Sequence, residues 1–414
     1  MKRATGFLWL LVLPLAATAL QPLANSWAGE ERLQDPPLPI KDGVLSILGE
    51  KNEQSVHAQI KAGARVEHLK GVALDGSHVL PASLAELKEY KHLTELSLPF
   101  TNLNDEGLRK IGELTNLEYL SLASTKIDNE GFSHLTQLSR LQALILGATR
   151  VDDQSAEVFR HFKALKKLHF YGERVSDALI DALREAKGMS DLCLYRSGVS
   201  GTGVATLSKS FPALARLSLE KTQLSDSALR SVATMDALEF LNLSETGVTA
   251  VGIRELKNHK SLTCIVLSRS IIDDDMAGTL QEFKRLKSVV VYGAKMSDGA
   301  RKLLADADQR GKLKVTGLNR IEALWEPASE PHTWPRTMDA AADRLLQELS
   351  AESKAQLKAT KAQDLVNYHQ NLGRTIRNSY GLWMGNGELM KDCRAQHPDD
   401  ASSRIVEAAW QKLQ

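Results

Sequence analysis

The sequence predicts an α/β solenoid of stacked parallel strands and helices, followed by a small all-α domain. Three observations lead to this fold class. The pattern Leu-x-x-Leu-x-Leu returns every 24 residues through more than half of the 414-residue chain. Fixed polar and apolar positions follow each copy of the pattern. Beyond the repeats the composition changes, because the tryptophans after Trp27 all lie there: Trp325, Trp334, Trp383 and Trp410.

The leucine pattern defines about ten stacked units. The alternation in Leu-x-Leu has period two, so a short strand turns its leucines inward and the residues between them outward. A unit of this length cannot bury its own apolar face, and its neighbours must cover it. One extra residue interrupts the period before Leu214, near Pro212. The units begin at Leu69, Leu93, Leu117, Leu141, Leu165, Met189, Leu214, Leu238, Leu262 and Leu286.

The remainder of each unit, counted from its first leucine, predicts a turn and a helix. Position nine is Thr or Ser in most units, as at Thr101, and its hydroxyl can satisfy backbone groups in the turn after the strand. Position thirteen is often Asp, as at Asp177 and Asp226, and we expect its carboxylate to cap the following helix. Apolar residues three or four apart then place that helix against the strand.

These units resemble the leucine-rich repeat, in a variant with Thr where many such repeats carry Asn or Cys. The resemblance covers about residues 69–315. It implies that strands line the concave side of a curved rod and that helices line its convex side. We therefore expect the solenoid to occupy residues 68–318. Residues 29–67 contain prolines and then a helical stretch, and we expect them to cap the first unit.

Residues 1–28 have the three-part pattern of a secretory signal peptide. Lys2 and Arg3 precede an apolar stretch of about 14 residues, and cleavage would follow Ala28 or Ala19. The apolar stretch is shorter than the roughly 20 residues that span a bilayer, which disfavours the alternative of a retained anchor. We expect an exported protein, in the periplasm, the cell envelope or outside the cell, with no stable membrane insertion after signal removal.

The C-terminal part divides into a linker and a helical domain. Residues 319–336 contain three prolines and predict a stiff linker, and residues 337–414 predict an all-α domain. The string from Gly373 to Asn386 resembles an uncharacterised helical domain of bacterial proteins, a resemblance that implies a domain boundary and no activity. Four residues of this string form either a hydrogen-bonded structural corner or a recognition site: Arg377, Asn378, Trp383 and Asn386.

We expect no enzyme, no cofactor and no metal site. The glycine-rich run 198–203 could suggest a nucleotide loop, but its glycines fall where other units carry small or turn residues. The acidic run 273–275 sits at the recurrent helix cap and lacks the alternating ligand spacing of a calcium loop. Cys393 and His397 are one helical turn apart, without the second Cys/His pair that a metal site would need.

The three cysteines do not predict a disulfide. Cys193 and Cys264 lie three units apart, or roughly 14 Å along a stack of strands. A disulfide needs Cα atoms within about 7 Å of each other. Because Cys393 belongs to the helical domain, we expect the periodic core alone to stabilise the solenoid.

The best candidate site is the concave face of the middle units. Its outward strand positions are rich in aromatic and basic residues, which is the composition of binding hot spots, although aromatics also serve cross-strand packing. We expect the partner to be a protein, since a net charge of +1 gives no indication of nucleic acid. The alternative is that the repeats deliver a C-terminal helical effector or enzyme to its target. The candidate residues are Tyr119, Ile145, Lys167, His169, Tyr171, Tyr195, Arg196, Arg216 and Phe240.

Overall fold

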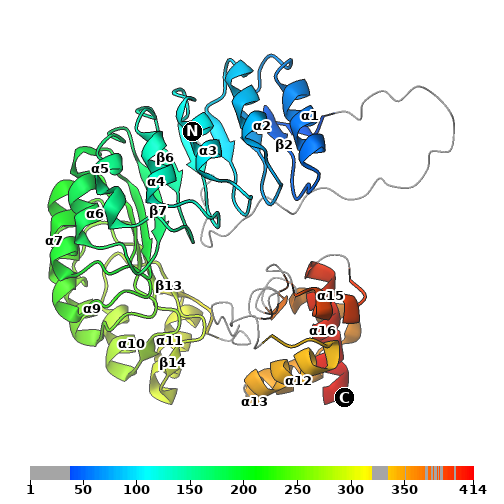
Figure 1. Cartoon of the computed structure of the whole chain (residues 1–414). Coiled ribbons are helices and arrows are strands. Elements are labelled where there is room, and N and C mark those ends of the chain that lie inside the picture. Colours follow the sequence, from blue (N-terminus) through cyan, green and yellow to red (C-terminus); the bar gives the residue numbers. More distant parts are fainter. Residues whose placement is uncertain are drawn as a thin grey trace, which may run out of the picture. The chain divides into compact units, whose positions relative to one another are not determined.

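A computed structural model describes most of the chain (Figure 1). The predicted signal peptide (1–28) and residues 319–333 of the predicted linker lie outside the described residues, as do Arg377, Asn378, Trp383 and His397. No helix of the described part is both long and apolar enough to cross a membrane. The described residues are 38–318, 334–349, 351–368, 372–373, 376, 380, 382, 386–395 and 398–414.

Residues 40–316 build one sheet of 13 strands, in which β2 to β15 run parallel in chain order and β1 pairs antiparallel with β2. A separate two-stranded pairing joins β12 to β14. The strands are β1 (Ile40–Lys41), β2 (Val44–Ser46), β3 (Gly71–Ala73), β4 (Glu95–Ser97), β5 (Tyr119–Ser121), β6 (Ala143–Ile145), β7 (Lys167–Tyr171), β8 (Asp191–Tyr195), β9 (Arg216–Ser218), β10 (Phe240–Asn242), β11 (Cys264–Val266), β12 (Ile271–Ile272), β13 (Ser288–Val290), β14 (Lys295–Met296) and β15 (Lys314–Thr316).

Helices follow the strands along the outer side of the solenoid, as Figure 1 shows. Several begin or end in a 3-10 turn. The α-helices are α1 (Glu53–Gly63), α2 (Pro81–Ala85), α3 (Asp105–Gly112), α4 (Asn129–Phe132), α5 (Ala156–Phe159), α6 (Asp177–Ala182), α7 (Gly201–Ser210), α8 (Leu229–Val232), α9 (Ala250–Glu255), α10 (Asp274–Gln281) and α11 (Asp298–Gln309). The 3-10 turns are η1 (Glu86–Glu89), η2 (Ser133–Leu135), η3 (Asp153–Ser155), η4 (Leu183–Glu185) and η5 (Asp226–Ala228).

The strand register confirms the predicted period and the place of its interruption. Strands β3 to β8 pair residues 24 apart, as in Lys167 with Asp191. Asp191 then pairs with Arg216, which is 25 residues further along the chain. The extra residue falls in a unit whose helix α7 has ten residues, whereas α6 has six and continues into the three-residue turn η4, and α8 has four and follows the three-residue turn η5. A longer helix therefore takes up the insertion without moving the strand.

The inward strand positions form the core, as the period-two alternation predicts. Leu192 and Leu217, at position four of successive units, are fully buried, and Leu168 and Leu241 at the same position of the neighbouring units are buried with them. Phe132 at the end of α4 and Phe159 at the end of α5 are buried as well, with ring centroids 5.1 Å apart. Since each unit's core residues contact those of the next unit, the core is a continuous column and not a set of separate clusters.

The turn after each strand has a recurrent left-handed residue. Position eight has positive φ in most units, mostly in residues other than glycine, such as Phe100 (φ 58) and Arg196 (φ 54). This conformation costs a non-glycine residue about 1–2 kcal/mol. The predicted role of position nine is confirmed next to it, because Thr125 Oγ1 donates to the carbonyl of Leu122 at 2.6 Å. The buried hydroxyl thus provides a hydrogen-bond donor for a backbone carbonyl in the turn, where the strand ladder ends.

The predicted helix caps are wrong by one residue. Position twelve caps the helices, as where Ser200 Oγ accepts from the N–H of Thr202. The aspartate at position thirteen instead accepts from the capping residue of the next unit. Asp177 accepts from the N–H of Ser200 at 2.9 Å and from its hydroxyl at 2.6 Å. Burial raises the pKa of Asp177, but these hydrogen bonds outweigh it and hold the pKa below its usual range. The carboxylate thus joins two units.

Glycine at position fifteen leaves room for that carboxylate. A Cβ on Gly203 would lie 2.1 Å from Asp177 Oδ1, and one on Gly252 would lie 2.4 Å from Asp226 Oδ1. Both glycines lie inside the first turn of their helices, α7 and α9. Gly203 thus occupies a recurrent position of the repeat, where its missing side chain permits a link between units.

Both ends of the solenoid sheet differ from its middle. At the start, the hairpin of β1 and β2 and helix α1 occupy part of the segment expected to cap the first unit. Tyr90 Oη donates to the carbonyl of Ile60 in α1 at 2.7 Å, which joins this segment to the repeats. At the other end, β15 pairs with β13 as the final strand, at the place where the leucine pattern fades.

The C-terminal region is helical, as predicted. Its described helices are α12 (Met338–Glu348), α13 (Ala351–Ala359), the 3-10 turn η7 (Ala362–Tyr368), α15 (Gly387–Asp392) and α16 (Pro398–Leu413). They enclose an apolar cluster of their own, which includes Leu345, Tyr380, Cys393 and Ile405. The Trp410 indole N–H donates to the carbonyl of Thr360 at 2.9 Å and so joins α16 to the end of α13.

Replacing Leu192 by alanine should lower the free energy of unfolding by about 2–5 kcal/mol, because it removes a fully buried side chain from the core column. Cys193→Ser is the matched control, since its side chain points to the opposite face of β8 and is half-buried. Urea denaturation of both variants measures the difference. A larger loss for the Cys193 variant would contradict the strand register.

Replacing Gly203 by alanine should destabilise the solenoid by about 1–3 kcal/mol, because the new methyl group displaces the carboxylate of Asp177 from Ser200. Gly278→Ala is the control. A Cβ on Gly278, inside α10, meets nothing within 4 Å, and this change should stabilise by about 0.4–1 kcal/mol. Equal effects of the two changes in thermal or urea unfolding would contradict the proposed link between units.

Candidate functional site

The middle strands bring charged and aromatic side chains together on the concave face. Because β7 to β10 pair in register, Lys167, Asp191, Arg216 and Phe240 form one row across four strands. Their side chains alternate with the buried leucines, so all four lie on the face opposite the helices. We call these four residues and the tyrosine pair Tyr171 and Tyr195 the middle patch.

Asp191 is the centre of the row. Its Oδ2 lies 3.7 Å from Lys167 Nζ and 3.7 Å from Arg216 Nε, while its Oδ1 lies 3.4 Å from His169 Nε2. Burial raises the pKa of Asp191, but His169, Lys167 and Arg216 together outweigh it and hold that pKa below its usual range. The carboxylate therefore stays ionised and attracts the three basic side chains around it.

Arg216 also contacts the next strand. Its guanidinium carbon lies 4.3 Å from the centroid of the Phe240 ring, which is the geometry of a cation–π contact. The arginine is thus held by a carboxylate on one side and by an aromatic ring on the other, although 39% of its side chain remains exposed. A side chain fixed in this way loses little rotamer freedom when it binds a partner.

The two tyrosines of the middle patch pack against each other. Tyr171 and Tyr195 are register partners on β7 and β8, and their rings meet edge to face with centroids 5.7 Å apart. Gly147 provides the space, because a Cβ there would lie 2.2 Å from Tyr171 Cδ2. Burial raises the pKa of both phenols, that of Tyr195 to about 12. Both hydroxyls therefore remain hydrogen-bond donors at neutral pH.

An apolar cluster adjoins Phe240 on the following strands. Cys264 and Val266 on β11 and Val290 on β13 are buried together, with Phe240 and Tyr292 packed against them. Their outward strand positions were absent from the predicted site. The sequence does carry a signal for them, since these strands lose the alternation of apolar and polar residues that the earlier strands show.

A chain of charged residues follows the ends of the same strands. Glu245 pairs with Lys221 at 3.6 Å and also with Arg269, and Asn242 Nδ2 donates to Glu220 Oε2 at 2.8 Å. Burial raises the pKa of Glu220 above its usual range, although the bond from Asn242 opposes this. The cations at these strand ends are therefore matched with carboxylates of the solenoid itself.

The structure separates several predicted site residues from the middle patch. Ile145 and His169 occupy outward strand positions as expected, but neighbouring side chains bury them. Arg196 is not on the strand face. Its left-handed backbone places it in the turn after β8, where its guanidinium pairs with Glu173 at 2.7 Å. The structure leaves Lys167, Tyr171, Tyr195, Arg216 and Phe240 together.

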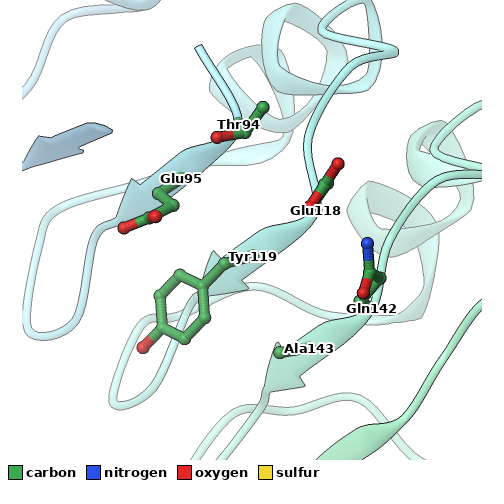
Figure 2. Close-up of a pocket in the computed structure, with 6 residues that line it drawn as sticks. All are labelled: Thr94, Glu95, Glu118, Tyr119, Gln142 and Ala143. Carbon is green, nitrogen blue, oxygen red and sulfur yellow. The ribbon is translucent and has the colours of Figure 1, made fainter. Parts of the chain in front are cut away.

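Tyr119 lies in a second place on the concave face. It lines an open hollow of about 390 Å³ across β4, β5 and β6. Figure 2 shows Tyr119 and Glu95 directed to one side of these strands, and Glu118 and Gln142 directed to the other. Since Glu95 and Glu118 point apart, the polar side chains of this hollow do not converge on one point where a ligand could bind.

The residues Cys193, His169 and Asp191 are the types that nucleophilic enzymes use, and they lie on adjacent strands. Burial raises the pKa of the Cys193 thiol to about 12, so it stays protonated at neutral pH. His169 Nε2 faces Asp191, and among the described residues His169 Nδ1 has no hydrogen-bond partner. These contacts do not activate a thiolate. Nowhere in the described part do three or more His, Cys, Asp or Glu side chains group to hold a metal ion.

The helical domain contains one described residue of its predicted site. Asn386 is buried, and its amide donates to the carbonyls of Pro335 at 2.9 Å and Tyr380 at 2.8 Å. Its Oδ1 accepts from the N–H of Leu389 and caps α15. For Asn386, these contacts support a hydrogen-bonded structural corner over a recognition site.

Comparison with protein families identifies both parts of the chain. Residues 91–112 and 113–135 match a family described as Leucine Rich repeat. The chain carries leucine-rich repeats. Residues 334–413 match a family described as a domain of unknown function, DUF6794. No curated protein matches the sequence.

Solved structures of similar fold share 16–18% sequence identity with this leucine-rich-repeat chain. An internalin (inlF) from Listeria monocytogenes has 16% identity and a TM-score of 0.46, over 66% of this chain and 86% of the internalin. A structure of the Rad7 and Elc1 complex in yeast has 18% identity and a TM-score of 0.45, over 63% and 77%. The mouse RP105/MD-1 complex has 17% identity and a TM-score of 0.38, over 56% and 44%.

The lowered pKa of Asp191 predicts a pH-dependent contribution to stability. A carboxyl whose pKa is lower in the folded than in the unfolded state stabilises above its unfolded value, near 3.9, and this contribution is lost as the pH falls through the folded value. The difference in unfolding free energy between the wild type and Asp191→Asn should therefore be larger at pH 6 than at pH 3. Asp181→Asn, on α6, controls for the loss of a more exposed carboxylate. A difference that does not change with pH would contradict the role of Asp191.

Proposed function

We propose that this chain recognises another protein through the concave face of its leucine-rich repeats, with the middle patch as the centre of the interface. The observation that carries the proposal is that the concave face carries both Arg216 over Phe240, on β9 and β10, and the tyrosine pair, at the ends of the neighbouring strands β7 and β8. Tyrosine and arginine are among the residues that dominate binding energy at protein interfaces, particularly when they lie near the centre of a well-packed patch.

Rigidity supports this proposal. Asp191 and Phe240 hold Arg216, and Tyr171 and Tyr195 hold each other, so these side chains lie in fixed positions before any partner arrives. Preorganised contact residues lose less conformational entropy on binding. Cross-strand packing explains the tyrosine pair equally well on its own, but it does not explain why a guanidinium stays partly exposed above an aromatic ring.

We further propose that the protein acts outside the cytoplasm. The support is the sequence pattern of residues 1–28, with two basic residues, a short apolar stretch and small residues at the cleavage position. An exported recognition protein would meet its partner in the cell envelope or beyond it, so an envelope fraction is the appropriate source for affinity capture of that partner.

Truncating Tyr195 or Arg216 to alanine should weaken binding of the captured partner by at least about 1–2 kcal/mol, because each removes a central contact. Arg184→Ala and Arg230→Ala are the matched controls, since both arginines lie on the helical side of the solenoid and pair with neighbouring carboxylates. Titration of each purified variant against the partner gives the affinities, and urea unfolding verifies that the solenoid is intact.

The proposal would be overturned by full binding of the concave-face variants together with loss of binding when residues 337–414 are deleted. That result would place recognition in the helical domain. It would favour the alternative in which the repeats serve a C-terminal effector.

The mature protein should begin near Gly29, because the expected cleavage follows Ala28. N-terminal sequencing of the protein from the envelope or the medium of the producing cell measures this directly. An intact Met1 on a protein that stays in the cytoplasm would refute the proposed export, and a start at Leu20 would place the cleavage after Ala19.

A further inference from the structure

The concave face offers a cation beside an apolar surface, and this arrangement defines the chemistry of a partner. We infer that the middle patch and the apolar cluster of β11 and β13 together bind a peptide segment in which a carboxylate side chain lies two to four residues from an aromatic or large aliphatic one. This inference rests on the proposed function, since it names the segment that the concave face would recognise.

The first step concerns charge. Lys167 and Arg216 share the carboxylate of Asp191, each at 3.7 Å, a distance longer than a direct hydrogen bond. At the strand ends, by contrast, Arg196 has its own contact with Glu173 at 2.7 Å. One anion between two cations leaves the row with excess positive charge. A carboxylate from a partner would complete the pairing.

The second step concerns geometry. Arg216 lies over the Phe240 ring, and this contact fixes the plane of its guanidinium while part of the side chain stays exposed. A guanidinium presents its N–H groups as a planar fork that matches a carboxylate with two parallel hydrogen bonds. Lysine cannot provide this match. The preferred place for the partner's acid is therefore above Arg216, with Lys167 as a second positive charge.

The third step concerns the surface next to that acid. Phe240 connects Arg216 to the apolar cluster of Cys264, Val266 and Val290. Arg216 on β9 is in register with Phe240 and, through it, with Cys264 on β11, so two strand spacings, or about 10 Å, separate Arg216 from Cys264. An extended peptide advances about 3.3 Å per residue. About three residues therefore separate a carboxylate bound by Arg216 from an apolar side chain on the cluster.

A nucleic acid fits this surface less well than an acidic peptide. The face of the Phe240 ring is occupied by Arg216 and is not open for a base to stack on. Glu220, whose hydrogen-bond donor is the neutral amide of Asn242, lies near the end of β9 and would repel a phosphate backbone that continued past Arg216. A single side-chain carboxylate followed by an apolar residue meets neither obstacle.

The test begins with random twelve-residue peptides displayed on phage and selected on the immobilised full chain. Selected peptides should pair Asp or Glu with Phe, Trp, Leu or Ile at the stated spacing. Each is then synthesised with a fluorescent label, together with an analogue in which the acid is replaced by Gln or Asn. Fluorescence anisotropy gives the dissociation constants for the wild type, for Arg216→Gln and for Arg230→Gln as the matched control on the helical side.

We expect the neutral analogue to bind the wild type at least about tenfold more weakly than the acidic peptide. Arg216→Gln should weaken the acidic peptide by a similar factor and should barely affect the neutral analogue, because the two changes remove the same contact. Arg230→Gln should leave both dissociation constants unchanged. The Arg216→Gln protein must unfold in urea like the wild type, and Lys167→Gln gives a second, smaller loss in the same direction.

Five results would overturn the inference. Selection of no peptide above a bare surface is one, and equal binding of an acidic peptide and its neutral analogue is another. The third is comparable binding of a labelled oligo-dT that Arg216→Gln abolishes, since this would show a general anion site. Selected peptides could also bind the wild type without an acidic residue and bind the Tyr195→Ala variant more weakly. This result would overturn the inference but leave the proposed function intact. Peptide binding that is lost only when residues 337–414 are deleted would overturn both the inference and the proposed function.

Discussion

The solenoid depends on the inability of any one unit to bury its own leucines. Each unit supplies a three- to five-residue strand and a short helix, which is too little to enclose a core. The parallel strand ladder places Leu192 of one unit beside Leu217 of the next, and both are fully buried. Every other feature follows from this stacking, because it sets the strand spacing at about 4.8 Å and brings equivalent positions of successive units into rows.

Rows of equivalent positions explain how the concave face acquires its chemistry. Position three reads Lys167, Asp191, Arg216 and Phe240 in four successive units, and the ladder turns this sequence of residues 24 or 25 apart into adjacent side chains. A substitution at one unit therefore changes one place in the row and leaves the backbone unaltered. The face can diversify while the leucines, the position-nine hydroxyls and the capping residues maintain the stack.

The sequence allowed the periodic features to be predicted and concealed those that depend on contacts between units. The inward leucines and the hydroxyl of Thr125 agree with expectation, because each follows from local alternation or turn chemistry. The cap was misplaced, because the aspartate of position thirteen finds its partner 23 residues away, as Asp177 does at Ser200. Local helix preferences carry no information about such a partner.

The candidate site shows the same division. The aromatic and basic residues of β7 to β10 were identified from the alternation, and the structure brings Lys167, Tyr171 and Arg216 to one face. Arg196 was misplaced because a left-handed residue turns the chain out of the strand, and alternation no longer describes it. Asp191 was absent from the predicted set of site residues, since its importance appears only when the basic residues on both sides are seen to share it.

The carboxylate link between units also has a mechanical consequence. Asp153, Asp177 and Asp226 each tie the start of one helix to the next, but Gly201 and Ala250 stand at the same position and have no side-chain oxygen to do so. The outer side of the solenoid is therefore cross-linked unevenly. The seam after the unit of β8 is the weaker one, because Arg254 and Lys257 pair with Asp275 and Glu282 across the seam after the unit of β10. A solenoid bends most easily where the links between its units are fewest. Any change in curvature would concentrate there, beneath the strands that carry the middle patch.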